Sequence, residues 1–458
     1  MKRANKHQMN KINVPPLVGG INVALLPEQI ADNEMQICEN FLYDSAILKG
    51  RQGLSSVYSF ESDIISMYYD FDMNCTFVFL RNREAFMVVA STGTPQVTPI
   101  GSVTGDEKPQ CCKFHNKLFI ASGGYLQYYD YEGGTSVVTL LNSQICNRVF
   151  YRFARLAVCR TGSDNIYYSA TGDATSDTAW VEDTNDDSSS KWLEIGYADS
   201  GDIVEIVPLA TDMIVFKSNA KAYQLVGDAD FNTWQVYNIA NFTDITEDFA
   251  QGICATNLGN EVVFLSLRGL RSMAATQDYG NIATADIGDR FNDLLTAHLY
   301  EPELWNFRRS KMLVIRPTES KRYFVVYNYS VNAATTWTFK DDITCFCETK
   351  DDIFVGAGNK LYVFSDSTTD NGDAIDYRIV TKDLASSDEI LVKAIDTKFS
   401  ADYAGVANVR LDERLAVNMP TNDRRKVKCN HSSPLLHVDI TSNHRFAIDN
   451  ISLDVVDL

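Results

Sequence analysis

The sequence has no hydrophobic run long enough to cross a membrane, and no apolar stretch of signal-peptide length follows its N-terminus. We therefore expect no membrane anchoring and no secretory route. Basic residues are also scarce: 41 Lys and Arg face 60 Asp and Glu, which gives a formal net charge of −19. This balance argues against a surface that grips DNA, because phosphate binding depends on Lys and Arg. An acidic wall could still let DNA pass as cargo.

Enzyme motifs are missing as well. The chain has no Gly-x-Ser-x-Gly, no His-Glu-x-x-His, no Walker-type loop and no Gly-x-Gly-x-x-Gly. Ser218-Asn-Ala-Lys221 matches the Ser-x-x-Lys pattern, but it falls in an expected hairpin turn instead of at a helix start. Because the chain has 60 acidic residues, a catalytic pair of carboxylates of the glycosidase type remains an alternative. We expect no catalytic residue, no cofactor and no enzymatic activity.

Histidines and cysteines show no clear metal-binding pattern. His431 and His437 stand six positions apart with Pro434 between them, and we expect both to be solvated. The ten cysteines contain no Cys-x-x-Cys, which predicts reduced and mostly buried thiols. Cys345 and Cys347 could hold a metal, but no matching second pair exists.

One acidic segment has the spacing of a Ca²⁺ loop. Asp183, Asn185 and Asp187 alternate, and Glu194 occupies the twelfth position, where a carboxylate would close the ligand shell. However, Ser188 stands where the sharp turn needs glycine, and no helices flank the loop. These four residues are candidate metal ligands, with a solvated acidic loop as the alternative.

Short apolar runs recur along the chain at intervals of 38 to 58 residues. Each is followed by a tight polar or glycine turn and a second strand rich in Tyr, Phe or Leu. The runs are centred on Phe77–Phe79, Leu118–Ile120, Leu156–Val158, Ile214–Phe216, Val262–Phe264, Leu313–Ile315 and Ile353–Val355. This period is typical of the four-stranded sheets of a β-propeller.

We predict a mostly β protein with a propeller of six, possibly seven, blades over residues 57–370. Residues 1–56 are expected to form an extended N-terminal arm with a short helix, since Asn33 and Gln36 resemble a capping box before Phe41. Residues 371–458 are expected to form a C-terminal β module, and a second helix is possible near 291–299. The alternative fold is a pair of β-sandwiches.

The opening segment resembles the arm of phage tail propeller proteins. The resemblance rests on the apolar glycine turn Leu17-Val-Gly-Gly20, on Leu26–Gln29, Asn33-Glu34 and Glu39-Asn40, and on the Arg-x-Gly element Arg51-Gln-Gly53 that leads into the first blade.

A second resemblance lies in the middle of the chain. Residues 201–227 and the following stretch from Gly252 to Met273 are similar to the central blades of the packaged-DNA stabilisation family, the tail hub or nozzle of short-tailed bacteriophages. That family resembles a six-bladed propeller, whereas this chain has seven recurring units.

The resemblance implies a structural protein of the virion tail, synthesised and assembled in the bacterial host cytoplasm. Such hubs form a homohexameric ring under the portal and adaptor proteins, close the DNA channel, retain the genome, permit its ejection and carry tail fibres or spikes. The candidate contacts with subunits or partners are Lys2, Arg3, Lys6, Gly19, Gly20 and Arg51. The basic start could dock on an acidic partner or simply be solvated.

Two other functions stay open. The chain could be a non-enzymatic propeller that binds a receptor or a carbohydrate, or it could be a propeller hydrolase. Ring formation would favour the tail hub, whereas convergent carboxylates in a pocket would favour the hydrolase.

Overall fold

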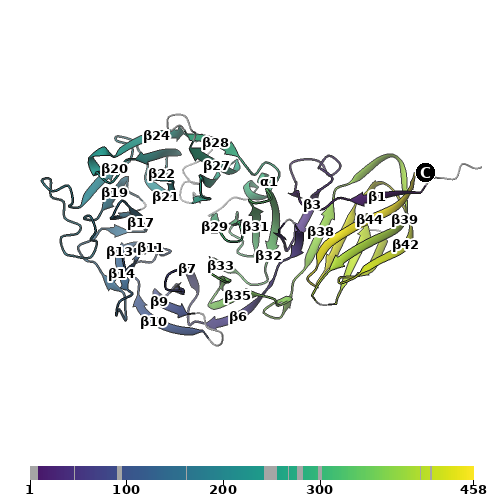
Figure 1. The fold of residues 1–458 in the computed structure, drawn as a ribbon, viewed down its shortest axis with the longest axis horizontal. Helices are drawn as coiled ribbons and strands as arrows, with labels where there is room; N and C mark the ends of the chain where they lie inside the picture. The colour runs from purple at the N-terminus through teal and green to yellow at the C-terminus, as the bar shows by residue number, and fades with distance from the viewer. Residues whose placement is uncertain are drawn as a thin grey trace, which may run out of the picture.

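The computed structural model describes residues 9–45, 47–89, 95–160, 162–241, 255–266, 268–275, 282–297, 302–402, 404–412 and 415–457. A ring of radial sheets occupies one side of Figure 1, and a β-sandwich lies beside it.

The ring contains seven four-stranded units in the described part of the chain. The first three are β7 (Ile64–Asp70), β8 (Cys75–Leu80), β9 (Glu84–Val89) and β10 (Gln96–Ser102); β11 (Gln110–Phe114), β12 (Lys117–Ala121), β14 (Gln127–Asp130) and β15 (Val138–Thr139); and β17 (Arg148–Arg152), β18 (Arg155–Cys159), β19 (Asn165–Tyr168) and β20 (Lys191–Glu194). The strands β13 (Gly124–Tyr125) and β16 (Ile145–Cys146) form a small extra pair.

The other four units complete the circle. They are β21 (Ile203–Leu209), β22 (Asp212–Lys217), β23 (Lys221–Val226) and β24 (Gln235–Asn241); β25 (Ala255–Asn257), β26 (Glu261–Ser266), β27 (Gly269–Ala275) and β28 (Ile282–Asp286); β29 (Glu303–Phe307), β30 (Met312–Arg316), β31 (Tyr323–Asn328) and β32 (Ala333–Thr338); and β33 (Ile343–Glu348), β34 (Ile353–Ala357), β35 (Lys360–Ser365) and β6 (Gly53–Ser59). The only helical turns among the described residues are η1 (Phe231–Thr233) and α1 (Asn292–Thr296).

This arrangement confirms the predicted propeller and gives it seven blades. Each of the seven apolar runs found in the sequence is the second strand of a blade. These strands are buried almost throughout, as in β8 and β30, because each blade packs between two neighbours. Burial on both faces explains why the runs are continuously apolar instead of alternating.

The ring closes with a strand from the start of the chain. β6 pairs antiparallel with β35 and becomes the outer strand of the seventh blade. Gly53 to Ser59 pair with Ser365 to Lys360, so the propeller begins before residue 57. The ladder joins the two ends of the ring and covers an edge that would otherwise stay exposed.

The sandwich is built from both ends of the chain. One sheet has the order β4 (Phe41–Asp44), β5 (Ile47–Gly50), β44 (Ala447–Asp457), β39 (Leu384–Ser400) and β42 (Arg424–Leu436), with β1 (Asn10–Val14) paired to β44. The other has the order β3 (Glu34–Glu39), β38 (Tyr377–Thr381), β43 (Val438–Ser442), β40 (Val406–Leu411) and β41 (Leu415–Pro420), with β2 (Gly20–Ile21) beside β3. The short strands β36 (Thr369–Asp370) and β37 (Asp373–Ala374) extend blade seven.

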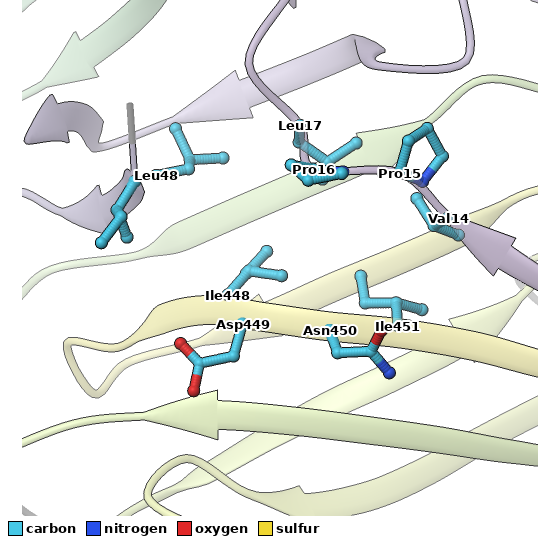
Figure 2. A pocket seen from close by; sticks show the side chains of 10 residues that line it. Val14, Pro15, Pro16, Leu17, Leu48, Ile448, Asp449, Asn450 and Ile451 are labelled. Carbon is cyan, nitrogen blue, oxygen red and sulfur yellow. The ribbon is translucent and has the colours of Figure 1, made fainter. Parts of the chain in front are cut away.

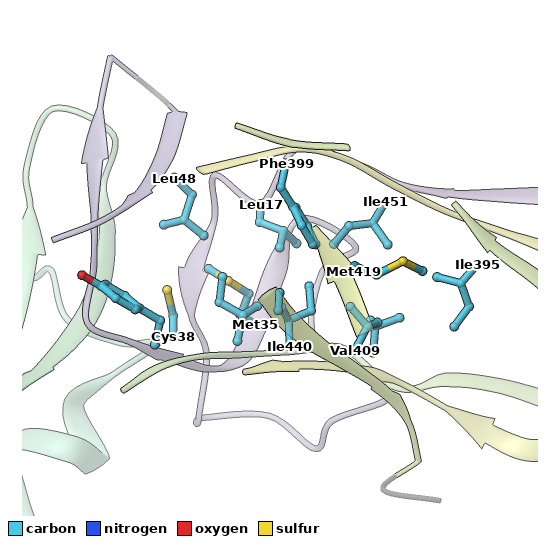
Figure 3. Packing of buried hydrophobic residues seen from close by; sticks show 14 of the residues in the cluster. Leu17, Met35, Cys38, Leu48, Ile395, Phe399, Val409, Met419, Ile440 and Ile451 are labelled. Carbon is cyan, nitrogen blue, oxygen red and sulfur yellow. The ribbon is translucent and has the colours of Figure 1, made fainter. Parts of the chain in front are cut away.

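Residues from both ends share the sandwich core, as Figure 3 shows. Leu17, Met35 and Cys38 come from the N-terminal segment and pack with residues such as Phe399 and Ile440. All five are almost completely buried. The N-terminal segment is therefore an integral part of the sandwich core, not a free arm.

The prediction of a helix near Asn33 is wrong, because this segment forms the strand β3. Gln36, expected to cap a helix, instead donates its side-chain amide to the backbone of Thr381 at 2.8 Å and to Asp383 at 2.7 Å. Pairing with β38 thus replaces the local hydrogen bonds that a capping box would make. The other expected helix is present as α1.

Candidate functional site

A buried arginine links the propeller to the sandwich. Arg51 lies between β5 and β6, and its side chain is only 1% exposed. Its guanidinium donates to both carboxylate oxygens of Asp370 at 2.9 and 2.6 Å, and to the Asn40 side chain at 2.9 Å. It also donates to the backbone oxygens of Gln52 and Thr338. All five N–H groups therefore have an acceptor.

The four residues Arg51, Asn40, Thr338 and Asp370, here called the junction, come from separate parts of the fold. Asn40 connects β3 to β4 in the sandwich, Thr338 ends blade six, and Asp370 belongs to β36 of blade seven. The guanidinium also lies 4.2 Å from the centre of the Phe339 ring. Arg51 thus binds groups of its own chain, and its buried side chain is not exposed for the predicted contact with another subunit.

Gly19 and Gly20 are also buried inside the chain. Gly20 has a φ of +77°, and a Cβ there would lie 2.6 Å from the backbone nitrogen of Ala334 in blade six. A Cβ on Gly19 would meet Glu34 and the Asn33 oxygen within 3 Å. Only glycine allows this approach of the sandwich to the propeller. The pair is therefore not an exposed contact, contrary to the prediction, and Lys2, Arg3 and Lys6 lie outside the described residues.

The predicted Ca²⁺ loop is occupied by the protein's own cations. Lys191 donates to the backbone oxygens of Asp183 and Asp186 at 3.1 and 3.0 Å, and Arg155 donates to that of Asp187. Asp183 uses its carboxylate for the Asn185 backbone N–H, while Glu194 lies in β20. Among the described residues, no three acidic, His or Cys side chains are grouped to hold a metal ion. The four candidate ligands are not brought together.

The cysteine pair of β33 is enclosed in the propeller. Cys345 and Cys347 are both buried free thiols. Burial raises the pKa of Cys345 to about 11 and raises the pKa of Cys347 further. Such thiols stay protonated and are poor metal ligands and nucleophiles at neutral pH.

The Ser-x-x-Lys match is also structural. The Ser218 hydroxyl accepts from the Asp202 backbone N–H, whereas Lys221 forms an ion pair with Asp199 at 2.8 Å. Burial opposes ionisation of Asp199, but hydrogen bonds from Lys221, Tyr223 and Asn219 outweigh it and hold its pKa at about 2. Ser218 and Lys221 therefore have separate partners and do not form a nucleophile and base.

His431 and His437 are partly buried in the sandwich and each lies beside a carboxylate, so they are not the freely solvated side chains that were predicted. His431 Nε2 lies 2.9 Å from Asp412, and His437 Nδ1 lies 3.1 Å from Asp383. The imidazole side chains are 11% and 22% exposed. Their carboxylate partners are distant in sequence, which is why no local pattern revealed them.

An open groove marks the surface of the sandwich between β1 and β5, as Figure 2 shows. Its volume is about 360 Å³, and it is lined by Val14, Pro15, Pro16, Leu17, Ile47, Leu48 and residues 448–451. β1 pairs with residues 451–455 of β44 and β5 with Ala447, so residues between them have no strand on this side in the described part of the chain. Pro15 and Pro16 end the β1 ladder because they have no N–H to donate.

Among the described residues, no helix has the length and apolar character needed to cross a membrane. No protein-family model matches the chain, and no curated protein matches it in sequence.

The comparison with solved structures finds matches of low sequence identity. The WD40 domain of Neurospora crassa Pan2 aligns with 70% of this chain and 96% of its own length, at 8% identity and a TM-score of 0.45. BamB from Moraxella catarrhalis aligns with 78% of this chain and 96% of its own, at 10% identity and a TM-score of 0.39. PorZ of Porphyromonas gingivalis, a surface component of the type-IX secretion system, aligns with 80% of this chain and 46% of its own, at 10% identity and a TM-score of 0.41.

Proposed function

We propose that this chain is a non-enzymatic structural subunit of a phage tail hub or nozzle. In this proposal, copies assemble into a ring, six by the resemblance, beneath the portal and adaptor proteins of a short-tailed phage. The ring closes the DNA channel, retains the packaged genome and permits its ejection. Tail fibres or spikes attach outside.

The observation that supports the proposal is the role of the positions that carry the resemblance. Gly19, Gly20 and Arg51 are buried where the sandwich meets blades six and seven. They connect two β domains into one body, which suits a subunit that must keep its shape under the pressure of packaged DNA. The sheet of blade six also continues into the sandwich where Glu39 of β3 pairs with Thr336 of β32.

The charge distribution is compatible with DNA as passing cargo. Residues 57–370, which contain most of the propeller, have a formal net charge of −17, and the rest of the chain accounts for −2. An acidic surface repels phosphate and so would leave a duplex free to slide.

Negative-stain electron microscopy with light scattering on the purified chain tests the proposal. We expect six-fold rings with an open centre, either alone or after addition of a portal and adaptor complex. A chain that stays monomeric under both conditions would contradict the tail hub and leave a binding propeller as the better hypothesis.

A further inference from the structure

One face of the sandwich carries a group of cations in an otherwise acidic protein. It is the outer face of the sheet formed by β1, β44, β39 and β42, here called the cationic face. Its basic residues are Lys11 of β1, Lys393 and Lys398 of β39, and Arg424, Lys426 and Lys428 of β42. β42 itself has no acidic residue among its thirteen positions.

Two carboxylates of this face, Asp396 and Asp454, lie beneath its cations. Arg424 binds both oxygens of Asp396 at 3.0 and 2.6 Å, and Lys426 lies 2.5 Å from Asp454. The Asp396 and Asp454 side chains are only 5% and 14% exposed, whereas those of Arg424 and Lys426 are 60% and 52% exposed. Lys398 also pairs with Asp449 at 3.3 Å, and the Asp449 side chain is 29% exposed. The six cations outnumber these three paired carboxylates, so the face carries a surplus of positive charge.

Two of these cations have no acidic partner. Lys393 donates to the Asn430 side chain at 3.1 Å, Lys428 is exposed, and no carboxylate in the described part of the chain lies within ion-pair distance of either. Charges on a terminal strand also prevent edge-to-edge pairing of sheets. That role concerns the backbone edge, whereas Arg424, Lys426 and Lys428 point from the face of the sheet. A partner on this face would meet side chains instead of a free strand.

A complementary acidic surface lies at the opposite end of the molecule. The connection between β19 and β20 is far from the sandwich along the long axis in Figure 1. It carries Asp173, Asp177, Glu182, Asp183, Asp186 and Asp187, with no Lys or Arg between residues 169 and 190. Arg155 and Lys191 bind backbone oxygens of this connection, so the acidic side chains at 182–187 project outward from a fixed loop.

We propose that the cationic face docks on the β19–β20 connection of a second copy of this chain. The proposal deepens the tail-hub function and rests on it, because it identifies the contact that joins neighbours in the ring. Such a contact uses two different surfaces, and head-to-tail contacts of this kind generate rings when the rotation closes. The contact weakens with salt because both surfaces are exposed.

The test uses the full-length chain and two charge-reversal variants that leave the buried carboxylates paired. Lys393→Glu/Lys428→Glu alters the cationic face, and Glu182→Lys/Asp187→Lys alters the connection. Lys350→Glu/Lys360→Glu, at exposed propeller positions, is the matched control. Sedimentation velocity at 50 and 500 mM salt measures association, and electron microscopy records the shape of the assemblies.

We expect the native chain and the control to associate at low salt, and each reversal variant to associate at least about tenfold more weakly. An equimolar mixture of the two reversal variants should regain association. In this mixture the reversed, acidic face of one variant meets the reversed, basic connection of the other. The native cationic face likewise meets the native acidic connection. If both reversal variants still associate, the proposed contact is wrong. If these variants also form rings, the tail-hub function is still supported. Restored association without rings supports the contact and contradicts the ring.

Loss of association without restoration in the mixture overturns the contact between copies. Binding of labelled duplex DNA to the native chain at 50 mM salt, lost in Lys393→Glu/Lys428→Glu, would then identify nucleic acid as the partner. A native chain that is monomeric at 50 mM salt with and without a portal complex overturns both proposals.

Discussion

The Nη2 atom of Arg51 lies 2.6 Å from an Asp370 oxygen, although 319 positions separate the two residues in the chain. The pair is nearly inaccessible to solvent, with side-chain exposures of 1% and 9%. It lies where the chain leaves the sandwich for the propeller and where it returns. The two passages between domains are thus tied to each other at one point.

Arg51→Ala should destabilise the protein by about 3–5 kcal/mol, because it leaves Asp370 as a buried charge without its partner. Urea unfolding followed by circular dichroism and by tryptophan fluorescence measures the effect. The matched control is Arg83→Ala, which removes an ion pair with Asp106 whose side chains are 48% and 75% exposed. That variant should lose much less stability, because exposed ion pairs contribute little. Equal losses in the two variants would show that the junction contributes little.

Gly20→Ala should cost at least about 3 kcal/mol, since the new methyl group meets the Ala334 backbone in addition to the strain of a left-handed φ. Gly172→Ala separates the two effects. Gly172 has a φ of +75°, and a Cβ there meets nothing within 4 Å. Its substitution should cost only about 1–2 kcal/mol. Thermal unfolding of both variants provides the comparison, and similar melting temperatures would argue against the close approach.

Asp199→Asn should lose roughly 2 kcal/mol at neutral pH and much less near pH 2. The pKa of Asp199 in the folded chain is about 2, below its ordinary value of 3.8. The ionised carboxylate therefore stabilises the fold above about pH 4, and this contribution disappears as the pH falls through 2. Free energies of unfolding at pH 6 and pH 2.5 measure it. A difference between variant and native chain that is independent of pH would contradict the assignment.

Thiol reagents should react slowly with the folded chain at pH 8. Burial raises the pKa of Cys112 to about 12 and that of Cys345 to about 11, so few thiolates are present. All nine described cysteines are free, and Cys254 lies outside the described residues. Ellman's reagent should therefore modify at most one thiol quickly before urea is added, and all ten afterwards. Two or more fast thiols in the folded state would contradict the burial of this set.

The propeller was predictable because its most buried strands have a recognisable sequence pattern. Phe77–Phe79 and Leu313–Ile315 are apolar at every position, since both faces of their strands are covered by neighbouring blades. The tight turns that follow them completed the pattern. The recurrence of one strand type was thus enough to indicate the fold, whereas the choice between six and seven blades needed the structure.

The sandwich and the junction were not predictable in the same way, because their partners are distant in sequence. Gln36 has a helical capping pattern locally, yet it binds Thr381 and Asp383. His431 has no acidic neighbour in the chain, yet Asp412 lies beside it. Arg51 was recognised only as part of a family element, and nothing near it indicated Asp370. Interactions of this kind require the tertiary structure.

The pairing of β1 with β44 determines the order in which the two domains can fold during translation. All seven blades have been translated by residue 365, so the propeller can close while the rest of the chain is still emerging. The sandwich cannot follow until Ala447–Asp457 has been synthesised, and until then Leu17, Met35 and Cys38 lack their cover. Each newly translated chain would therefore expose part of the apolar sandwich core for a short time. Chaperones that bind apolar segments would encounter this surface before the sandwich closes.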